Sequence, residues 1–207
     1  MSTTFQVYPK KEYIPTFQEV IKLTNSKLND YISNTCAINI TNYIDVEIQT
    51  IKGHNKVPFN IVDGMKWDDK NYAWFYVNGV AGGTDCYFYT HTDLDRRMWM
   101  EELATKTYNQ EIKTIIKSNL NVGHYWSFRR SAGQPGIIAL SYGFLAASIA
   151  KITEGFVYSD DGAWNYAMFP AMPEDFFKWY FQPELADCEN DKIFSTNCIK
   201  SLYNELK

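Results

Sequence analysis

The longest uncharged stretch of the chain runs from Ser131 to Ala150, with the sequence SAGQPGIIALSYGFLAASIA. A Gly-Gln-Pro-Gly run interrupts its first part, which leaves about 15 apolar or small residues. That length is short for a membrane span and typical of a buried helix. A helix that is apolar on most sides must be covered by other elements. We therefore expect a buried helix over about 135–152 and no transmembrane segment.

A short strand pattern lies on each side of this helix. Val122–Arg130 precedes it with alternating aromatic and polar residues, and Gly155–Tyr158 follows it. Two strands joined by a helical crossover favour a β-α-β unit, because parallel strands need such a connection. We expect this unit over about residues 122–160, with the helix sandwiched against the sheet.

The remaining elements complete an α+β domain with a mixed β-sheet and helices packed on it. Hydrophobic periodicity and turn residues predict further helices at about 15–32, 93–120, 173–181 and 191–206, strands at 37–40 and 43–51, a hairpin of 72–77 with 86–89, and a short strand at 59–62. The polar segment 52–70 reads as a long connection and a weak lobe boundary. A chain of 207 residues fits one domain, and we expect a single domain over 1–207.

Charge and composition restrict the partners. The net charge is -4, and Lys and Arg never form a run, so the basic footprint of a nucleic-acid-binding protein is missing. An acidic domain suits a basic protein partner instead. Aromatic residues reach 16%, which indicates a core of large rings or an interaction face. The N-terminal MSTTFQVYPKK lacks the apolar core of a signal peptide, which favours a cytoplasmic location.

Motifs for catalysis, metals and cofactors are weak throughout. The four cysteines form no CxxC pair and are expected as reduced thiols, although a bridge between Cys188 and Cys198 stays open. His91, Asp93 and Asp95 suggest a metal tract, but Thr92 or Asp93 is better explained as a helix cap. The chain has no GxSxG elbow and no phosphate-binding loop. We therefore predict no catalytic residue, no cofactor and no metal.

Two adjacent carboxylates, Asp160 and Asp161, follow the strand that ends at Tyr158. Successive side chains of a strand point to opposite faces, so these two groups do not share one proton as an acid/base couple. The sequence Ser-Asp-Asp-Gly favours a tight turn. A partner or ligand contact at this turn remains the alternative.

Two arginines, Arg129 and Arg130, end the strand before the buried helix. Alternation places His124, Trp126, Phe128 and Arg130 on one side of this strand and Arg129 on the other. If the strand ending at Tyr158 is a parallel neighbour, an arginine and an aspartate meet at the carboxyl edge of the sheet, as a salt bridge or as part of a site. The candidate partner-binding or structural edge comprises Arg129, Arg130, Asp160, Asp161 and Trp164.

Residues 122–182 carry a resemblance to a known class. The segments HYWSFRRSAGQPGIIALSYGFLAASIAKITEG and FVYSDDGAWNYAMFPAMPEDFFKWYF combine an arginine-bearing strand, Gly-Gln-Pro, a small-residue helix and Ser-Asp-Asp-Gly-Ala-Trp. This arrangement resembles immunity proteins of bacterial polymorphic toxin systems, such as contact-dependent inhibition, Rhs or type VI secretion effector loci. The resemblance implies a protein that binds a cognate toxin domain and blocks it without catalysis. It implies nothing about which toxin activity is neutralised.

Three hypotheses of function follow. The first is a toxin-neutralising immunity protein with an acidic and aromatic contact surface around Asp160, Asp161 and Trp164. The second is a small hydrolase or ligand-binding enzyme with an Arg/Asp site at the carboxyl edge of the sheet. The third is a structural subunit, which an obligate homodimer with buried aromatic residues would favour.

Overall fold

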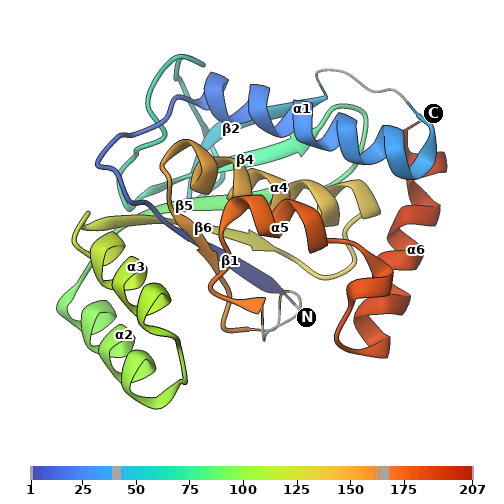
Figure 1. Ribbon diagram of the computed structural model, residues 1–207. Coiled ribbons are helices and arrows are strands. Elements are labelled where there is room, and N and C mark those ends of the chain that lie inside the picture. The colour runs from blue at the N-terminus through green and yellow to red at the C-terminus, as the bar shows by residue number, and fades with distance from the viewer. Residues whose placement is uncertain (1, 39–42, 162, 164–167, 207) are drawn as a thin grey trace.

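The computed structural model describes residues 2–38, 43–161, 163 and 168–206, which form a sheet covered by helices (Figure 1). The described strands are β1 (Thr3–Tyr8), β2 (Ile44–Thr50), β3 (Lys56–Val57), β4 (Asn71–Val77), β5 (Thr84–Thr90), β6 (His124–Arg130) and β7 (Phe156–Tyr158). The described α-helices are α1 (Phe17–Cys36), α2 (Asp93–Thr105), α3 (Gln110–Leu120), α4 (Gly136–Ile152), α5 (Pro173–Trp179) and α6 (Glu189–Glu205), with a short 3-10 helix, η2 (Pro183–Leu185). Helices α1, α4 and α5 cover one face of the sheet, α6 packs on α4, and α2 and α3 lie together at one end of the sheet. The predicted α+β class is confirmed.

The strand order in the sheet is β3-β2-β4-β5-β6-β1-β7. Every pair of hydrogen-bonded strands is antiparallel, so the sheet is antiparallel where we expected a mixed one. Strands β6 and β7 run in the same direction and α4 connects them, as the β-α-β pattern predicted. However, β1 lies between them: Phe5 pairs with Phe128 of β6, and Val7 pairs with Val157 of β7. The strand-helix-strand unit is therefore split by the N-terminal strand.

The unpredicted strand β1 has the same alternation as the others. Phe5 and Val7 are fully buried and point toward the helices, where the Phe5 ring stacks 4.7 Å from that of Tyr142. Gln6 lies on the opposite side and is half-buried. Since neighbouring strands are about 4.8 Å apart, the insertion of β1 separates β6 from β7 by roughly 10 Å.

Helix α4 is the buried helix that the uncharged stretch predicted, and its residues from Gly136 to Ala150 are all buried. Gly143 lets Tyr180, the C-cap residue of α5, approach closely, because a Cβ atom at position 143 would lie 2.3 Å from the Tyr180 ring. The Tyr180 hydroxyl also donates a hydrogen bond of 2.7 Å to the carbonyl oxygen of Ala139. A glycine and a buried hydroxyl thus lock α4 to the segment that follows α5.

The segment predicted as one helix over 93–120 is two helices. Helix α2 begins after a capping box of Thr92 and Asp95, and its C-cap Lys106 has extended backbone angles. Helix α3 then begins anew, because the Asn109 side chain accepts a hydrogen bond of 2.8 Å from the backbone N–H of Ile112. Asn109 is a strong N-cap residue inside an otherwise periodic pattern, and the periodicity alone concealed the break.

Other local predictions differ from the structure in smaller ways. Helix α1 begins at Phe17 and continues to Cys36, past the predicted end near residue 32. Residues 59–62 form a turn rather than a strand, and the short strand in this connection is β3. Residues 37 and 38 are not in a strand, and the rest of the strand predicted at 37–40 lies outside the described residues. The connection 52–70 joins strands of the same sheet.

Two global sequence expectations concern membranes and cysteines. Among the described residues, no helix combines the length and hydropathy that a membrane span requires. All four cysteines are free thiols: Cys36, Cys86 and Cys198 are buried, and Cys188 is exposed. The open alternative of a bridge between Cys188 and Cys198 is therefore not adopted in this structure.

The N-terminus of α4 is capped from the far end of the chain. Its N-cap residue, Pro135, offers no side-chain acceptor, and the Glu205 carboxylate accepts the backbone N–H groups of Gly136 and Ile137 at 2.9 and 2.8 Å. We expect Glu205→Ala to lower the free energy of unfolding by about 0.5–2 kcal/mol, the usual cost of a lost helix cap. Urea denaturation measures the loss. The exposed neighbour Asn204, changed to alanine, serves as the control, and equal stability of the two variants would contradict the capping role.

Candidate functional site: an open sheet face and two flanking pockets

Among the described residues, the helix layer packs on one face of the sheet and leaves most of the other face uncovered. We call its central part the open face, defined by the outward side chains of β2, β4, β5 and β6: Asp45, Glu47, Tyr72, Trp74, Tyr76, Asp85, Tyr87, Tyr89, Tyr125 and Arg129. Most of these side chains are half-buried, and Tyr89 and Arg129 are exposed. Helix α2 reaches the same side of the sheet farther along, where Trp99 packs against Tyr8 and Tyr158. The open face is therefore a broad polar and aromatic surface.

Tyrosine rings form a continuous series across the open face. Tyr87 lies between Tyr72 and Tyr89, with ring centroids 5.8 and 6.0 Å apart. Tyr89 in turn lies 5.3 Å from Tyr125, which stacks 5.2 Å from Tyr8 of β1. The cross-strand pairs among them stabilise the sheet, and the contacts together hold the rings in fixed orientations. The face therefore presents rigid, amphipathic rings.

Carboxylates lie between these rings. The strand register places Glu47, Trp74, Asp85 and Arg129 side by side in one row across four strands. Glu47 forms an ion pair with Lys56, but within the described part of the chain no ion pair includes Asp45 or Asp85. Burial raises the pKa of Asp85 above its ordinary value, although the charges of Arg129 and His54 oppose this shift. Asp85 is thus a partly desolvated carboxylate among aromatic rings.

The raised pKa of Asp85 predicts a pH-dependent cost to stability. Because the pKa is higher in the folded state than in the unfolded state, ionisation disfavours folding, and stability falls as the pH rises from the unfolded pKa through the folded one. We expect Asp85→Asn to have a higher Tm than the wild type at pH 7. The difference should shrink as the pH is lowered toward 3. Thermal unfolding at several pH values measures it, with the exposed Asp69→Asn as control; a lower Tm for Asp85→Asn at pH 7 would exclude this account.

Asp160 and Asp161 diverge, as strand alternation predicted. Asp160 lines a hollow of about 170 Å³ beside α2, which we call the α2 hollow. Its lining consists of Gln6, Tyr8, Asp95, Met98, Trp99, Glu102, Tyr125, Tyr158 and Asp160. Asp161 instead lines a separate pocket of about 310 Å³ at the carboxyl ends of β6 and β7. The two adjacent carboxylates therefore serve different surfaces.

The pocket that contains Asp161 also contains Arg130. The guanidinium of Arg130 is buried between the rings of Tyr142 and Phe194, at 5.4 and 5.2 Å, and donates a hydrogen bond of 3.3 Å to the Thr3 hydroxyl. Its Nε has no acceptor among the described residues. The lining also includes Ala132, Gly133, Ala163 and Asp191. Burial raises the pKa of the Tyr142 hydroxyl to about 12, and the positive charge of Arg130 limits this rise.

The expected meeting of arginines and aspartates is realised only in part. Arg130 and Asp161 line one pocket, yet the ion pairs of the described residues include neither of them. Arg129 lies on the open face opposite Asp85, away from that pocket. The parallel-neighbour geometry on which the predicted pair depended is absent, because β1 separates the two strands. Trp164 lies outside the described residues.

The turn chemistry of the Ser-Asp-Asp-Gly stretch is present. The buried Ser159 hydroxyl donates a hydrogen bond of 3.1 Å to Asp161 and accepts one of 3.3 Å from the backbone N–H of Ala163. Ser and Asp side chains commonly hold turns in this way. Asp161 therefore has a structural partner, whereas no hydrogen bond of the described residues involves the Asp160 side chain.

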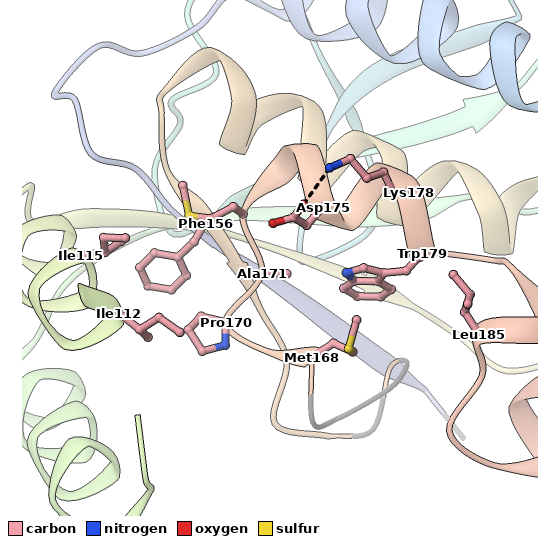
Figure 2. Close-up of a pocket in the computed structure, with 11 residues that line it drawn as sticks. Ile112, Ile115, Phe156, Met168, Pro170, Ala171, Asp175, Lys178, Trp179 and Leu185 are labelled. Carbon is pink, nitrogen blue, oxygen red and sulfur yellow. Dashed lines mark hydrogen bonds and ion pairs between the residues drawn. The ribbon is translucent and has the colours of Figure 1, made fainter. Parts of the chain in front are cut away.

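An apolar groove of about 500 Å³ lies between α3 and α5. Figure 2 shows Ile112 and Ile115 on one side of the groove and Trp179 and Leu185 on the other, with the ion pair of Asp175 and Lys178 above it. Among the described residues that line the groove, the charged ones are Asp175 and Lys178, which pair with each other, and the others are apolar. The groove therefore offers contact area for an apolar group.

Three side chains that could act as a metal ligand or a nucleophile are Asp95, Cys86 and Cys198. The Asp95 carboxylate accepts hydrogen bonds of 2.7 and 2.6 Å from the backbone N–H and hydroxyl of Thr92, so its Oδ2 atom is committed to the cap of α2. Within the described residues, no three His, Cys, Asp or Glu side chains gather as a metal site. Burial raises the pKa of the Cys198 thiol to about 11 and that of Cys86 well above its usual value. Neither thiol is activated as a nucleophile.

Sequence reasoning missed the open face and the α2 hollow as sites. The hairpin residues Tyr72, Trp74, Tyr87 and Tyr89 were recognisable as aromatic, but the strand pattern did not tell which face the helices cover. The sequence feature that indicates the uncovered face is in β2, where Asp45, Glu47 and Gln49 alternate with buried aliphatic residues. Polar side chains on one side of a strand indicate a solvated sheet face.

Comparison with known proteins adds no assignment. No protein-family model, no curated protein and no solved structure matches this chain.

Proposed function

We propose that this chain is an immunity protein that binds a cognate bacterial toxin domain through the open face and neutralises it without catalysis. The observation that carries the proposal is the open face itself, where a row of tyrosine and tryptophan rings alternates with carboxylates on a rigid sheet. The sequence resemblance over residues 122–182 supports the same function. In this proposal the protein acts in the cytoplasm of the cell that produces the toxin.

The aromatic rings supply the affinity in this proposal. Tyrosine and tryptophan are enriched among the residues that dominate binding energy in protein interfaces, because a fixed ring buries a large area at a small entropy cost. Tyr87 is held between two other rings, and Trp74 lies against Gly83, where a Cβ atom would be 2.5 Å from its ring. These rings need little reordering when a partner binds.

The carboxylates indicate the chemistry of the partner. Asp45 and Asp85 have no ion-pair partner among the described residues, and the chain carries a net charge of -4. A complementary surface must bring cations, and a toxin whose active site attracts nucleic acid is one class of protein that has them. Opposite charges also accelerate encounter, which benefits an inhibitor that must act as soon as the toxin appears.

The test is neutralisation by the intact chain. We would search the neighbouring genes for a toxin domain, express it in a sensitive host, alone and together with this protein, and purify the pair by a tag on the toxin. We expect growth to be restored and the two proteins to co-elute at a ratio near one to one. Growth arrest that persists despite equal amounts of both proteins, or the absence of co-elution, would refute the proposal.

The second candidate is a ligand-binding or hydrolytic site in the pocket of Arg130 and Asp161. The specific observation in its favour is the buried guanidinium, whose Nε lacks an acceptor among the described residues. A buried charge of this kind is costly unless an anion pairs with it. Thermal unfolding in the presence of inorganic phosphate or acetate tests this candidate. A rise in Tm that is lost in Arg130→Met would favour it, and an unchanged Tm counts against it.

A further inference from the structure

The α2 hollow combines two groups of side chains that recognise cations. Its walls are the rings of Tyr8, Trp99, Tyr125 and Tyr158, which come from β1, α2, β6 and β7. Its lining also includes the more exposed carboxylates of Asp95, Glu102 and Asp160, which we call the rim. The faces of aromatic rings attract cations through the ring quadrupole, and carboxylates attract them directly. Both attractions therefore converge on one small space.

The arrangement of the rings is fixed by their contacts. Trp99 meets Tyr8 edge to face at 5.1 Å and lies 4.6 Å from Tyr158, while Tyr8 and Tyr125 stack at an angle of 16°. His91 extends this stack, 5.1 Å from Tyr125. Burial lowers the pKa of His91, so this ring is neutral at pH 7 and adds no competing charge, although Arg96 lies nearby on α2.

The chain itself places one cation at this rim. Lys106 forms an ion pair of 2.7 Å with Glu102, and its Nζ lies 5.9 Å from the centre of the Tyr158 ring. Glu102 is also held by the hydroxyl groups of Tyr108 and Tyr158, each at 2.8 Å. This corner is therefore satisfied internally, and it shows that a ring and a carboxylate of the hollow hold a cation together.

The opposite corner lacks such a cation. No ion pair of the described residues includes Asp160 or Asp95, and the exposed Asp160 carboxylate lies on the same hollow as the rings of Tyr8 and Tyr125. Both hydrogen bonds from Thr92 go to the Oδ2 atom of Asp95, so the cap does not use its Oδ1 atom. Asp160, and one oxygen of Asp95, thus stay available to an incoming donor.

We propose that the α2 hollow receives the guanidinium group of an arginine side chain on the protein partner. A guanidinium is flat, so it can stack on an aromatic ring while its N–H groups reach carboxylates at the edge, which a compact ammonium group cannot do. The hollow of about 170 Å³ has room for one such head group. The hollow adjoins the open face where the ring of Tyr125 contacts that of Tyr89, with centroids 5.3 Å apart, so one partner can cover both. This inference rests on the proposed function for the identity of the partner.

The test uses a small probe, methylguanidinium chloride, and the signal of the Trp99 indole N–H in NMR spectra of the intact chain. Ionic strength is held constant with sodium chloride. We expect a saturable shift with methylguanidinium, no shift with the neutral isostere methylurea, and binding of methylammonium at least five-fold weaker. A shift that does not saturate, an equal response to methylurea, or equal binding of methylammonium would overturn the proposal.

The neighbouring aspartates supply a matched pair of variants. Asp160→Asn removes a carboxylate from the hollow, whereas Asp161→Asn makes the same change of charge one residue away, in the other pocket, and keeps an oxygen for Ser159. We expect methylguanidinium to bind at least five-fold more weakly to Asp160→Asn and within two-fold of the wild type to Asp161→Asn. If both variants lose affinity for methylguanidinium equally, the loss follows from net charge alone and the proposed site is refuted.

The outcome is separable from that of the proposed function. Binding of methylguanidinium by a chain that neutralises no toxin leaves a guanidinium site and rejects the immunity function. Neutralisation of the toxin by a chain whose hollow ignores methylguanidinium keeps the function and rejects this site. If both hold, Asp160→Asn should also weaken the toxin complex at least five-fold relative to Asp161→Asn.

Discussion

Trp126→Ala is expected to lower the free energy of unfolding by about 3–5 kcal/mol, the usual cost of truncating a fully buried tryptophan. Trp126 has no exposed surface, its ring packs 5.8 Å from Phe88 and 5.1 Å from His124, and its Nε1–H donates a hydrogen bond of 2.7 Å to the carbonyl oxygen of Met65. The loss is large because domains are stable by only about 5–15 kcal/mol. Urea denaturation followed by circular dichroism measures it.

The Trp126→Phe variant separates packing from the hydrogen bond. It keeps most of the ring volume but leaves the buried Met65 carbonyl without its donor, for which we expect a loss of about 1–3 kcal/mol. The alanine variant should therefore be clearly less stable than the phenylalanine variant. If both lose less than about 1 kcal/mol, Trp126 does not anchor the connection 52–70 to the sheet as the structure indicates.

The parts of the fold that sequence predicted best are those with strong local patterns. Gly136–Ile152 is uncharged except at Lys151 and becomes the buried helix α4, and the hairpin of β4 and β5 follows from aromatic strands around glycine-rich turns. Alternation also separated Trp126 and Phe128, which are buried, from Arg129, which is exposed. Periodicity reports which side of an element is apolar, and these elements are apolar in simple ways.

The topology was harder to predict because it depends on a contact between distant segments. Thr3–Tyr8 forms a strand only by pairing with β6 and β7, more than a hundred residues away, and nothing in its own sequence specifies that position. Its insertion changed the site as well. It separated the strand ends that carry the arginines from those that carry the aspartates, so Arg130 and Asp161 share a pocket without an ion pair.

The candidate site depended on knowing which face of the sheet is free. Sequence reasoning singled out Asp160 because of its motif, and the structure places it in the α2 hollow with rings from three strands and a helix. No local spacing of residues along the chain predicts that side chains from these four elements meet in one hollow. Asp85 illustrates the same limit, since its partial burial among rings follows only from the strand register.

Asp85 also links stability to the proposed binding face. Burial makes this carboxylate costly to ionise, so Asp85→Asn should stabilise the free protein at neutral pH. In the complex, a cation of the partner would pair with the Asp85 carboxylate and offset its cost. Function commonly depends on residues of this kind, which are not optimal for stability. The same variant should therefore bind the toxin domain more weakly while it unfolds at a higher temperature.

The largest effect on the proposed function is expected from Tyr87→Ala. Tyr87 occupies the middle of the open face and is held in place by Tyr72 and Tyr89. Removal of a central interface ring commonly costs about 2–4 kcal/mol of binding free energy. The affinity for the cognate toxin domain should then fall by roughly 30- to 1,000-fold, and isothermal titration calorimetry with purified proteins measures it.

Tyr203→Ala is the matched control for this prediction, because Tyr203 is an exposed tyrosine on α6, outside the open face. It should bind the toxin domain with unchanged affinity, while Tyr87→Phe, which keeps the ring, should lose less than ten-fold. Circular dichroism confirms that each variant is folded before titration. Loss of a ring from the binding face must weaken binding more than loss of the same ring elsewhere. Equal affinities of Tyr87→Ala and Tyr203→Ala would therefore show that the toxin does not bind the open face. The apolar groove between α3 and α5 would then be the next surface to test, through Met172→Asp.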